Sequence, residues 1–172
     1  RSKILWIDDE IDHLKPHIIF LNEKGYEVSM CTSGKEGLAQ INEKNFDLVL
    51  IDQFMPGYDG IETSVNIKAI NPSLPIIMIT KSEEEWLIDE AIYKKIDRLL
   101  IKPINPSQVF AACKQVLERS LIISEKSKKE YLNQFQEIDD LSNHASSIED
   151  WWKIYSNLVR WQIDFDNQKE ES

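Results

Sequence analysis

The order of apolar and polar residues predicts strands and helices that alternate five times over the first 120 residues. Near-continuous short apolar runs are typical of parallel strands buried on both faces, and the stretches between them have helical spacing. This alternation predicts an α/β fold, a doubly wound five-stranded parallel sheet with helices on both faces. The strands are expected at 3–8, 26–30, 46–52, 75–80 and 97–102, and the helices at 11–24, 34–44, 61–70, 83–95 and from 106 onward.

The fifth helix is expected to run past residue 120, because neither Gly nor Pro follows Pro106. A break is expected at 139–147, where Ser146 and Glu149 have the spacing of a capping box. A further helix over 147–163 then carries a broad apolar stripe. Two interpretations stay open: the stripe packs on the extended helix as a hairpin, or it docks onto a downstream effector domain or a second protomer. The stripe consists of Ile148, Trp151, Trp152, Tyr155, Leu158 and Val159.

The pattern therefore divides the chain into a first domain over 1–120 and a helical extension over 121–172. A chain of 172 residues with 42% apolar residues is long and apolar enough for one packed core plus an extension. Its net charge of -10 argues against extensive binding of a phosphate backbone, so direct nucleic-acid binding is not expected.

Several features predict a cytoplasmic protein without a membrane association. No apolar run approaches the roughly 18–20 residues of a membrane-spanning helix, and the first residues do not have the pattern of a signal peptide. Cys31 and Cys113 form no metal-binding spacing and are expected to be reduced thiols.

Polar residues follow the apolar runs of four predicted strands. Asp8 and Asp9 end the first, Asp52 the third, Thr80 the fourth and Lys102 the fifth. Because ligands in such sheets bind beyond the carboxyl ends of the strands, these side chains are expected to meet at one edge. Each residue alone has a plain structural interpretation as a helix cap or a solvated side chain. Their combination, one set at each of four strand ends, predicts a functional site.

The residue types at this edge indicate a particular chemistry. Three carboxylates in close contact repel one another unless a cation neutralises them, and oxygen ligands of this kind favour Mg²⁺. An ammonium and a hydroxyl on the other side would hold the oxygens of a phosphoryl group. Asp52, between metal and ammonium, is then a plausible nucleophile that forms an aspartyl-phosphate.

These residues carry a resemblance to a known family. The stretch 4–10, the loop 52–60, Thr80 and the run 101–103 resemble the receiver domain of two-component response regulators, over about residues 3–120. The resemblance implies a flavodoxin-like sheet of strand order 2-1-3-4-5. It also implies that Asp52 accepts a phosphoryl group from a sensor histidine kinase, and that Thr80 and Lys102 contact the phosphoryl oxygens. Lys102–Pro103 would be a cis peptide bond.

The same resemblance implies the ligands of the metal ion. Asp8 and Asp9 match the acid pair that holds Mg²⁺, and Asp52 with the main-chain carbonyl of Phe54 completes the protein ligands. Two positions depart from the family pattern. Lys81 stands where a small residue is usual, and it could screen the site or contact the phosphate. Leu99 stands where an aromatic residue often reports activation, so the switch would rely on the helix at 83–95 moving as a body.

Less specific stretches, among them 6–12, 81–87, 131–138 and 150–153, are similar to PorX-type regulators of Bacteroidetes. That resemblance implies a receiver, a helical domain and then a PglZ domain of the alkaline-phosphatase superfamily, so that this chain would be an N-terminal fragment. It also implies a partner kinase and control of type IX secretion and gliding. A homodimer formed on activation, and a downstream effector domain or a sigma factor, are the further partners that we expect.

The function expected is thus a phosphorylation-dependent switch and not an enzyme. Two alternatives from other classes stay open. One is an interaction protein that keeps the receiver scaffold without using phosphorylation. The other is a phosphatase like the haloacid dehalogenases, which also form an aspartyl-phosphate. Those enzymes want a second Asp two residues after the nucleophile, where this chain has Phe54.

Overall fold

The computed structural model describes residues 1–81, 89 and 96–171 of the chain. The chain divides into two compact units, Arg1–Arg119 and Ser120–Ser172, and each is described here by itself. The helix expected at 83–95 lies, except for residue 89, outside the described residues.

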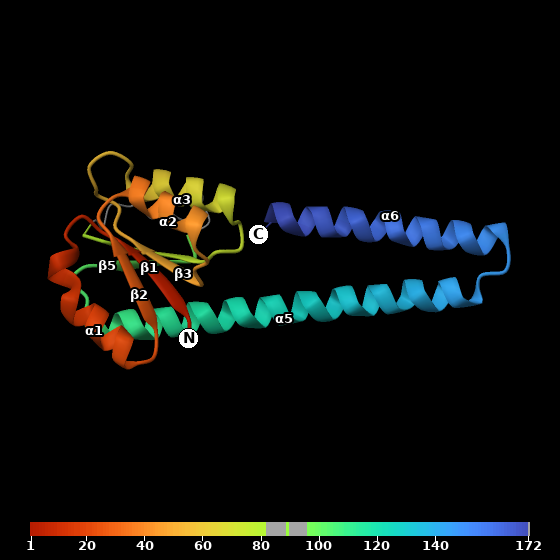
Figure 1. The fold of residues 1–172 in the computed structure, drawn as a ribbon, viewed down its shortest axis with the longest axis horizontal. Coiled ribbons are helices and arrows are strands. Elements are labelled where there is room, and N and C mark those ends of the chain that lie inside the picture. Colours follow the sequence, from red (N-terminus) through yellow and green to blue (C-terminus); the bar gives the residue numbers. More distant parts are fainter. Residues whose placement is uncertain (82–88, 90–95, 172) are drawn as a thin grey trace. The chain divides into compact units, whose positions relative to one another are not determined.

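The first unit contains a five-stranded parallel sheet of order β2-β1-β3-β4-β5 (Figure 1). This order and the expected α/β class are confirmed. Because the chain passes from β2 at one edge across β1 to β3, the order reverses between β1 and β3, which makes a topological switch point there. The strands are β1 (Lys3–Ile7), β2 (Glu27–Cys31), β3 (Leu48–Ile51), β4 (Ile76–Thr80) and β5 (Arg98–Ile101).

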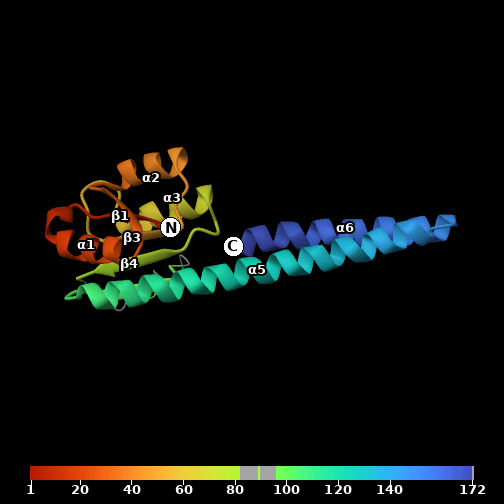
Figure 2. The ribbon, with the colours of Figure 1, turned by 60° about the horizontal axis from the view of Figure 1, so that its bottom comes forward.

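Helices cover both faces of this sheet, as the alternating pattern predicts. The side chains of β1 alternate between two apolar clusters: Ile4 and Trp6 face one, Leu5 and Ile7 the other, and all four are fully buried. One cluster includes residues of α1 (Lys15–Glu23) and α5 (Pro106–His144), and the other includes residues of α2 (Gly34–Glu43) and α3 (Gly60–Ile70). Figures 1 and 2 show α2 and α3 together on one side of the sheet.

Local sequence signals explain where several helices begin. The expected helix at 11–24 starts as a short 3-10 turn, Ile11–Leu14, and becomes α-helical at Lys15, where Pro16 suits the first turn. The Ser33 hydroxyl accepts a hydrogen bond from the Glu36 N–H at 3.2 Å, so Ser33 is the N-cap of α2. Cys31 and Cys113 are both buried and free.

The second unit is built from the rest of α5 and from α6 (Ile148–Glu171). The break expected at 139–147 is wrong for its first part, because α5 continues to His144. Side-chain hydrogen bonds four residues apart run along this stretch, Gln136 to Asp140 at 3.0 Å and Asn143 to Asp139 at 3.5 Å. With neither Gly nor Pro to stop it, the helix extends until the Ala145–Ser147 turn.

The capping box of α6 lies one residue later than expected. The Ser147 hydroxyl accepts a hydrogen bond from the Asp150 N–H at 3.2 Å, and the Asp150 carboxylate accepts one from the Ser146 N–H at 3.0 Å. These hydrogen bonds hold the pKa of Asp150 below its usual value. Ser147 rather than Ser146 is therefore the cap, and Asp150 takes the place expected for Glu149.

The face with which α6 packs on α5 also differs from the expected one. The expected stripe is exposed, most of all at Ile148, whose exposed fraction is 90%. The contacting face instead carries Ile154, which is 5% exposed, together with Trp161 and Phe165. Phe165 lies against Tyr131 of α5, with ring centroids 5.4 Å apart. Because α6 has apolar side chains on more than one face, the count of apolar residues alone did not identify the packed face.

Candidate functional site

Backbone hydrogen bonds continue just past the strand ends and hold the first residue beyond each strand. The Asp8 N–H donates to the Cys31 carbonyl at 3.1 Å, and the Asp52 N–H donates to the Ile7 carbonyl at 3.0 Å. On the other side of the sheet, the Lys102 N–H donates to the Thr80 carbonyl at 2.7 Å. The sheet itself therefore positions the expected site residues.

The carboxylates of Asp8, Asp9 and Asp52 converge beyond β1 and β3. Their nearest oxygens all lie within 4.8 Å of one another. Asp8 is only 1% exposed and Asp52 8%, while Asp9 is exposed. Three carboxylates this close, two of them desolvated, favour a bound cation, and oxygen ligands at the edge of a solvent-accessible site suit Mg²⁺. The donor set therefore fits the metal that the sequence indicates.

An ammonium group lies on the other side of this cluster. The Lys102 Nζ is 3.3 Å from Asp8 Oδ2 and 4.0 Å from Asp52 Oδ2, and the lysine side chain is 15% exposed. Thr80 is fully buried at the end of β4. The Lys102–Pro103 peptide bond is cis, as the resemblance implies. The structure thus brings together the side chains of Asp8, Asp9, Asp52 and Lys102, with Thr80 at the end of the neighbouring strand.

The pKa of Asp52 is raised from its ordinary value to about 6. Burial is the largest cause; Lys102 opposes the rise, and the nearby Asp8 and Asp9 add to it. A neutralising cation would therefore favour the ionised form of Asp52. Once ionised, it is a desolvated oxygen nucleophile beside an ammonium group.

The loop after Asp52 is held by a residue that sequence reasoning missed. The Gln53 side chain is buried, and its Oε1 accepts a hydrogen bond from the Ile61 N–H at 2.8 Å. Its carbonyl accepts another from the Gly60 N–H at 2.9 Å. At the start of α3, the Asp59 carboxylate accepts a hydrogen bond from the Glu62 N–H at 2.8 Å and caps the helix. The only sequence signal for Gln53 was a polar residue directly after Asp52.

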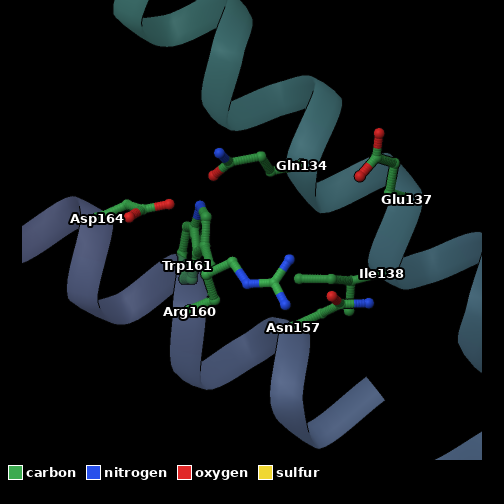
Figure 3. A pocket seen from close by; sticks show the side chains of 7 residues that line it. All are labelled: Gln134, Glu137, Ile138, Asn157, Arg160, Trp161 and Asp164. Carbon is green, nitrogen blue, oxygen red and sulfur yellow. The ribbon is translucent and has the colours of Figure 1, made fainter. Parts of the chain in front are cut away.

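The second unit holds a separate polar pocket between α5 and α6, with a volume of about 130 Å³ (Figure 3). Within it, Gln134 Oε1 and Trp161 Nε1 are buried and have no hydrogen-bond partner. A polar space of this size holds several ordered waters, which would satisfy both atoms. We therefore interpret this pocket as a water-filled space in the polar part of the contact between α5 and α6. Its lining is Gln134, Glu137, Ile138, Asn157, Arg160, Trp161 and Asp164.

Fold and site together define a doubly wound α/β domain with an acidic pocket beyond the carboxyl ends of its strands. Residues 4–114 match the model of the response regulator receiver domain, and the chain belongs to this family of two-component systems. Residues 121–172 match the PorX response regulator linker domain. Both resemblances noted in the sequence are therefore confirmed.

Two transcriptional regulatory proteins are similar to most of this chain. The transcriptional regulatory protein ZraR of Escherichia coli O157:H7 is 34% identical over 132 residues, which cover 77% of this chain and 30% of that protein. The transcriptional regulatory protein ResD of Bacillus subtilis is 34% identical over 120 residues, covering 70% and 50%. This chain thus spans about a third to a half of the length of these relatives.

Solved structures agree with this assignment. A CheY-like receiver domain protein from Methanospirillum hungatei superposes with a TM-score of 0.66 and 28% identity, over 69% of this chain and 95% of that one. Among the described residues, no helix is both long and apolar enough to cross a membrane.

The raised pKa of Asp52 leads to a prediction about stability. Without metal at pH 7, we expect Asp52→Asn to increase the free energy of unfolding by about 1–3 kcal/mol. The folded protein keeps the Asp52 proton up to pH about 6, whereas the unfolded chain releases it near pH 4. The ionised carboxylate therefore destabilises the fold above pH 6, and this penalty disappears as the pH falls towards 4.

Urea unfolding of both proteins from pH 4 to pH 8, in the presence of a chelator, measures this difference. The exposed cap variant Asp59→Asn serves as a control with the same change of charge in the same loop. A lower stability of Asp52→Asn than of the wild type at pH 7 would show that the carboxylate is not under electrostatic stress. Addition of Mg²⁺ should stabilise the wild type more than the Asp52→Asn variant.

Proposed function

We propose that this receiver is a phosphorylation-dependent switch in which Asp52 accepts a phosphoryl group from a sensor histidine kinase. One observation carries the proposal: the buried Asp52 carboxylate lies within reach of two further carboxylates on one side and of the Lys102 ammonium on the other. A structural role for any one of these residues would not require the other three. The family of the chain makes a histidine kinase the expected donor.

The residues have distinct roles in the proposed transfer. An oxygen of Asp52 attacks the phosphorus of the donor phosphohistidine, the new O–P bond forms, and the P–N bond breaks with its electron pair staying on the imidazole. Mg²⁺ would neutralise charge on the transferring group. The carboxylates of Asp8, Asp9 and Asp52 are the side chains that would hold it. The main-chain carbonyl of Phe54 is added as a ligand because the family resemblance implies it.

Lys102 and Thr80 act on the phosphoryl oxygens in this proposal. The Lys102 ammonium already lies between Asp8 and Asp52, so it is positioned to pair with an oxygen of the new acyl phosphate. The Thr80 hydroxyl would donate a hydrogen bond to another oxygen. The added group carries close to two negative charges, which is a large local change beside β4 and β5.

For the output, we propose that phosphorylation changes an interface with a second copy of the chain or with an effector domain. The exposed stripe of α6, which includes Trp151, Trp152 and Tyr155, supports this, since large contiguous apolar surfaces mark interaction sites. The linker match supports a PorX-type system that controls type IX secretion and gliding, with an effector domain or a sigma factor as the downstream partner.

The proposal can be tested by light scattering after size exclusion, with and without Mg²⁺ and beryllofluoride, a mimic of the phosphoryl group. We expect fluorine NMR to detect bound beryllofluoride in the wild type and not in Asp52→Asn. A rise in molar mass in the wild type alone would establish dimerisation as the readout. Binding without a change in mass would assign the output to an effector domain instead. No binding to the wild type would contradict the switch.

A further inference from the structure

A second lysine lies at the rim of the acidic site. Lys81 follows Thr80 at the end of β4, and its Nζ is 3.5 Å from Glu10 Oε2. Glu10 follows Asp9, and its own N–H donates to Asp8 Oδ1 at 2.9 Å, so its backbone is fixed to the carboxylate cluster. The ion pair therefore joins the loop after β4 to the loop after β1, next to the groups that would bind Mg²⁺.

The two lysines of the site differ in how strongly they are held. Lys102 is 15% exposed and lies between two buried carboxylates, whereas the side chains in the Lys81–Glu10 pair are 70% and 53% exposed. An exposed ion pair of this kind stabilises a protein only weakly. Lys81 can thus leave Glu10 at little cost when a group of higher negative charge arrives. A phosphoryl group, with close to two charges, attracts an ammonium more strongly than a single carboxylate does.

We propose that Lys81 is a second phosphoryl-binding cation of this site, and that Glu10 holds it at the rim until an anionic donor arrives. This inference rests on the proposed function of Asp52 as the acceptor. Lys81 takes no part in bond making. It exchanges the Glu10 carboxylate for a phosphoryl oxygen of the donor, which raises the rate of capture of small dianionic acyl phosphates and of phosphohistidine.

The charges of the site support this division of roles. The carboxylates of Asp8, Asp9 and Asp52 converge in the site, Glu10 follows Asp9 in the chain, and these negative charges would repel an incoming dianion. Lys102 lies inside this ring of negative charge. Among the residues that the structure describes, Lys81 provides an exposed cation at its edge, and such charges act on the rate of encounter with a donor.

The test is a double-mutant cycle with Lys81→Gln, Glu10→Gln and the double variant. Phosphorylation by acetyl phosphate with Mg²⁺ at low salt is followed on phosphate-affinity gels. We expect Lys81→Gln to slow labelling by about 3- to 10-fold. Glu10→Gln should accelerate labelling by freeing Lys81, and this acceleration should be lost in the double variant. The changes in labelling rate of the two single variants should become smaller at high salt, because Lys81 and Glu10 are exposed and salt screens their charges.

Lys114→Gln is the matched control, since Lys114 forms an exposed ion pair of similar kind with Glu118 on α5, at 4.0 Å. It should label at the wild-type rate. The inference is overturned if Lys81→Gln takes up the phosphoryl group as fast as the wild type or faster. Lys81 would then either have no effect on the labelling rate or block access of the donor to the site. It is also overturned if Glu10→Gln accelerates equally without Lys81. If the wild type takes no phosphoryl group at all, the proposed function fails as well, so the two failures are distinguishable.

Discussion

We expect Asp52→Asn to abolish phosphoryl transfer to this chain, and the wild type with Mg²⁺ and acetyl phosphate to take up one phosphoryl group. We expect the labelling rate to fall by at least about 100-fold. The amide has nearly the shape of the carboxylate but is a poor nucleophile. The variant keeps Asp8, Asp9 and Lys102 around position 52 but lacks the nucleophilic carboxylate oxygen there. Intact-protein mass spectrometry, with hydroxylamine to cleave an acyl phosphate, measures the outcome.

The control uses the same substitution seven residues away. Asp59 caps α3 through the Glu62 N–H, and Asn is an equally good N-cap, so Asp59→Asn should label at the wild-type rate. A chelator should stop labelling of the wild type, because the clustered carboxylates need a cation to admit a further anion. If Asp52→Asn still acquires a hydroxylamine-sensitive group, the acceptor is another residue and the roles assigned to this site are wrong.

The sequence predicted the sheet and its functional edge because one physical rule governs both. Runs such as Leu48–Ile51 are apolar at every position, which only a strand buried on both faces allows, and the structure buries all four residues. Once such strands are parallel, the residue after each one must lie at the same edge. The order of residues along the chain is therefore enough to place Asp8, Asp52 and Lys102 together.

What the sequence did not predict depends on contacts between distant residues. The packed face of α6 depends on contacts with Tyr131 of α5. The Tyr131 ring contacts Phe165, and the Tyr131 hydroxyl donates a hydrogen bond to Gln168 Oε1 at 2.6 Å. No local pattern in α6 could reveal that choice, since apolar residues lie on several of its faces. The pairing of Lys81 with Glu10, residues 71 positions apart, depends in the same way on β4 and β1 lying in one sheet.

We expect Gly60→Ala to lower the free energy of unfolding by about 3 kcal/mol and also to slow phosphoryl transfer to Asp52. A Cβ at position 60 would meet the Asp52 carbonyl oxygen, and it would lie 2.8 Å from the Gln53 Cα. Both neighbours are backbone, so no side chain can rotate out of the way. Gly60 cannot retreat either, because its own N–H donates to the Gln53 carbonyl at 2.9 Å.

Gly57→Ala is the control, because it replaces a glycine in the same loop without the close backbone contacts of position 60. Gly57 has φ of +81° with open space around it, so only backbone strain of about 1 kcal/mol is expected there. Urea unfolding should therefore rank Gly60→Ala well below Gly57→Ala in stability. Equal losses would show that the loop yields freely. Under conditions where both variants are folded, Gly60→Ala should also label more slowly, because the displaced backbone belongs to Asp52 itself.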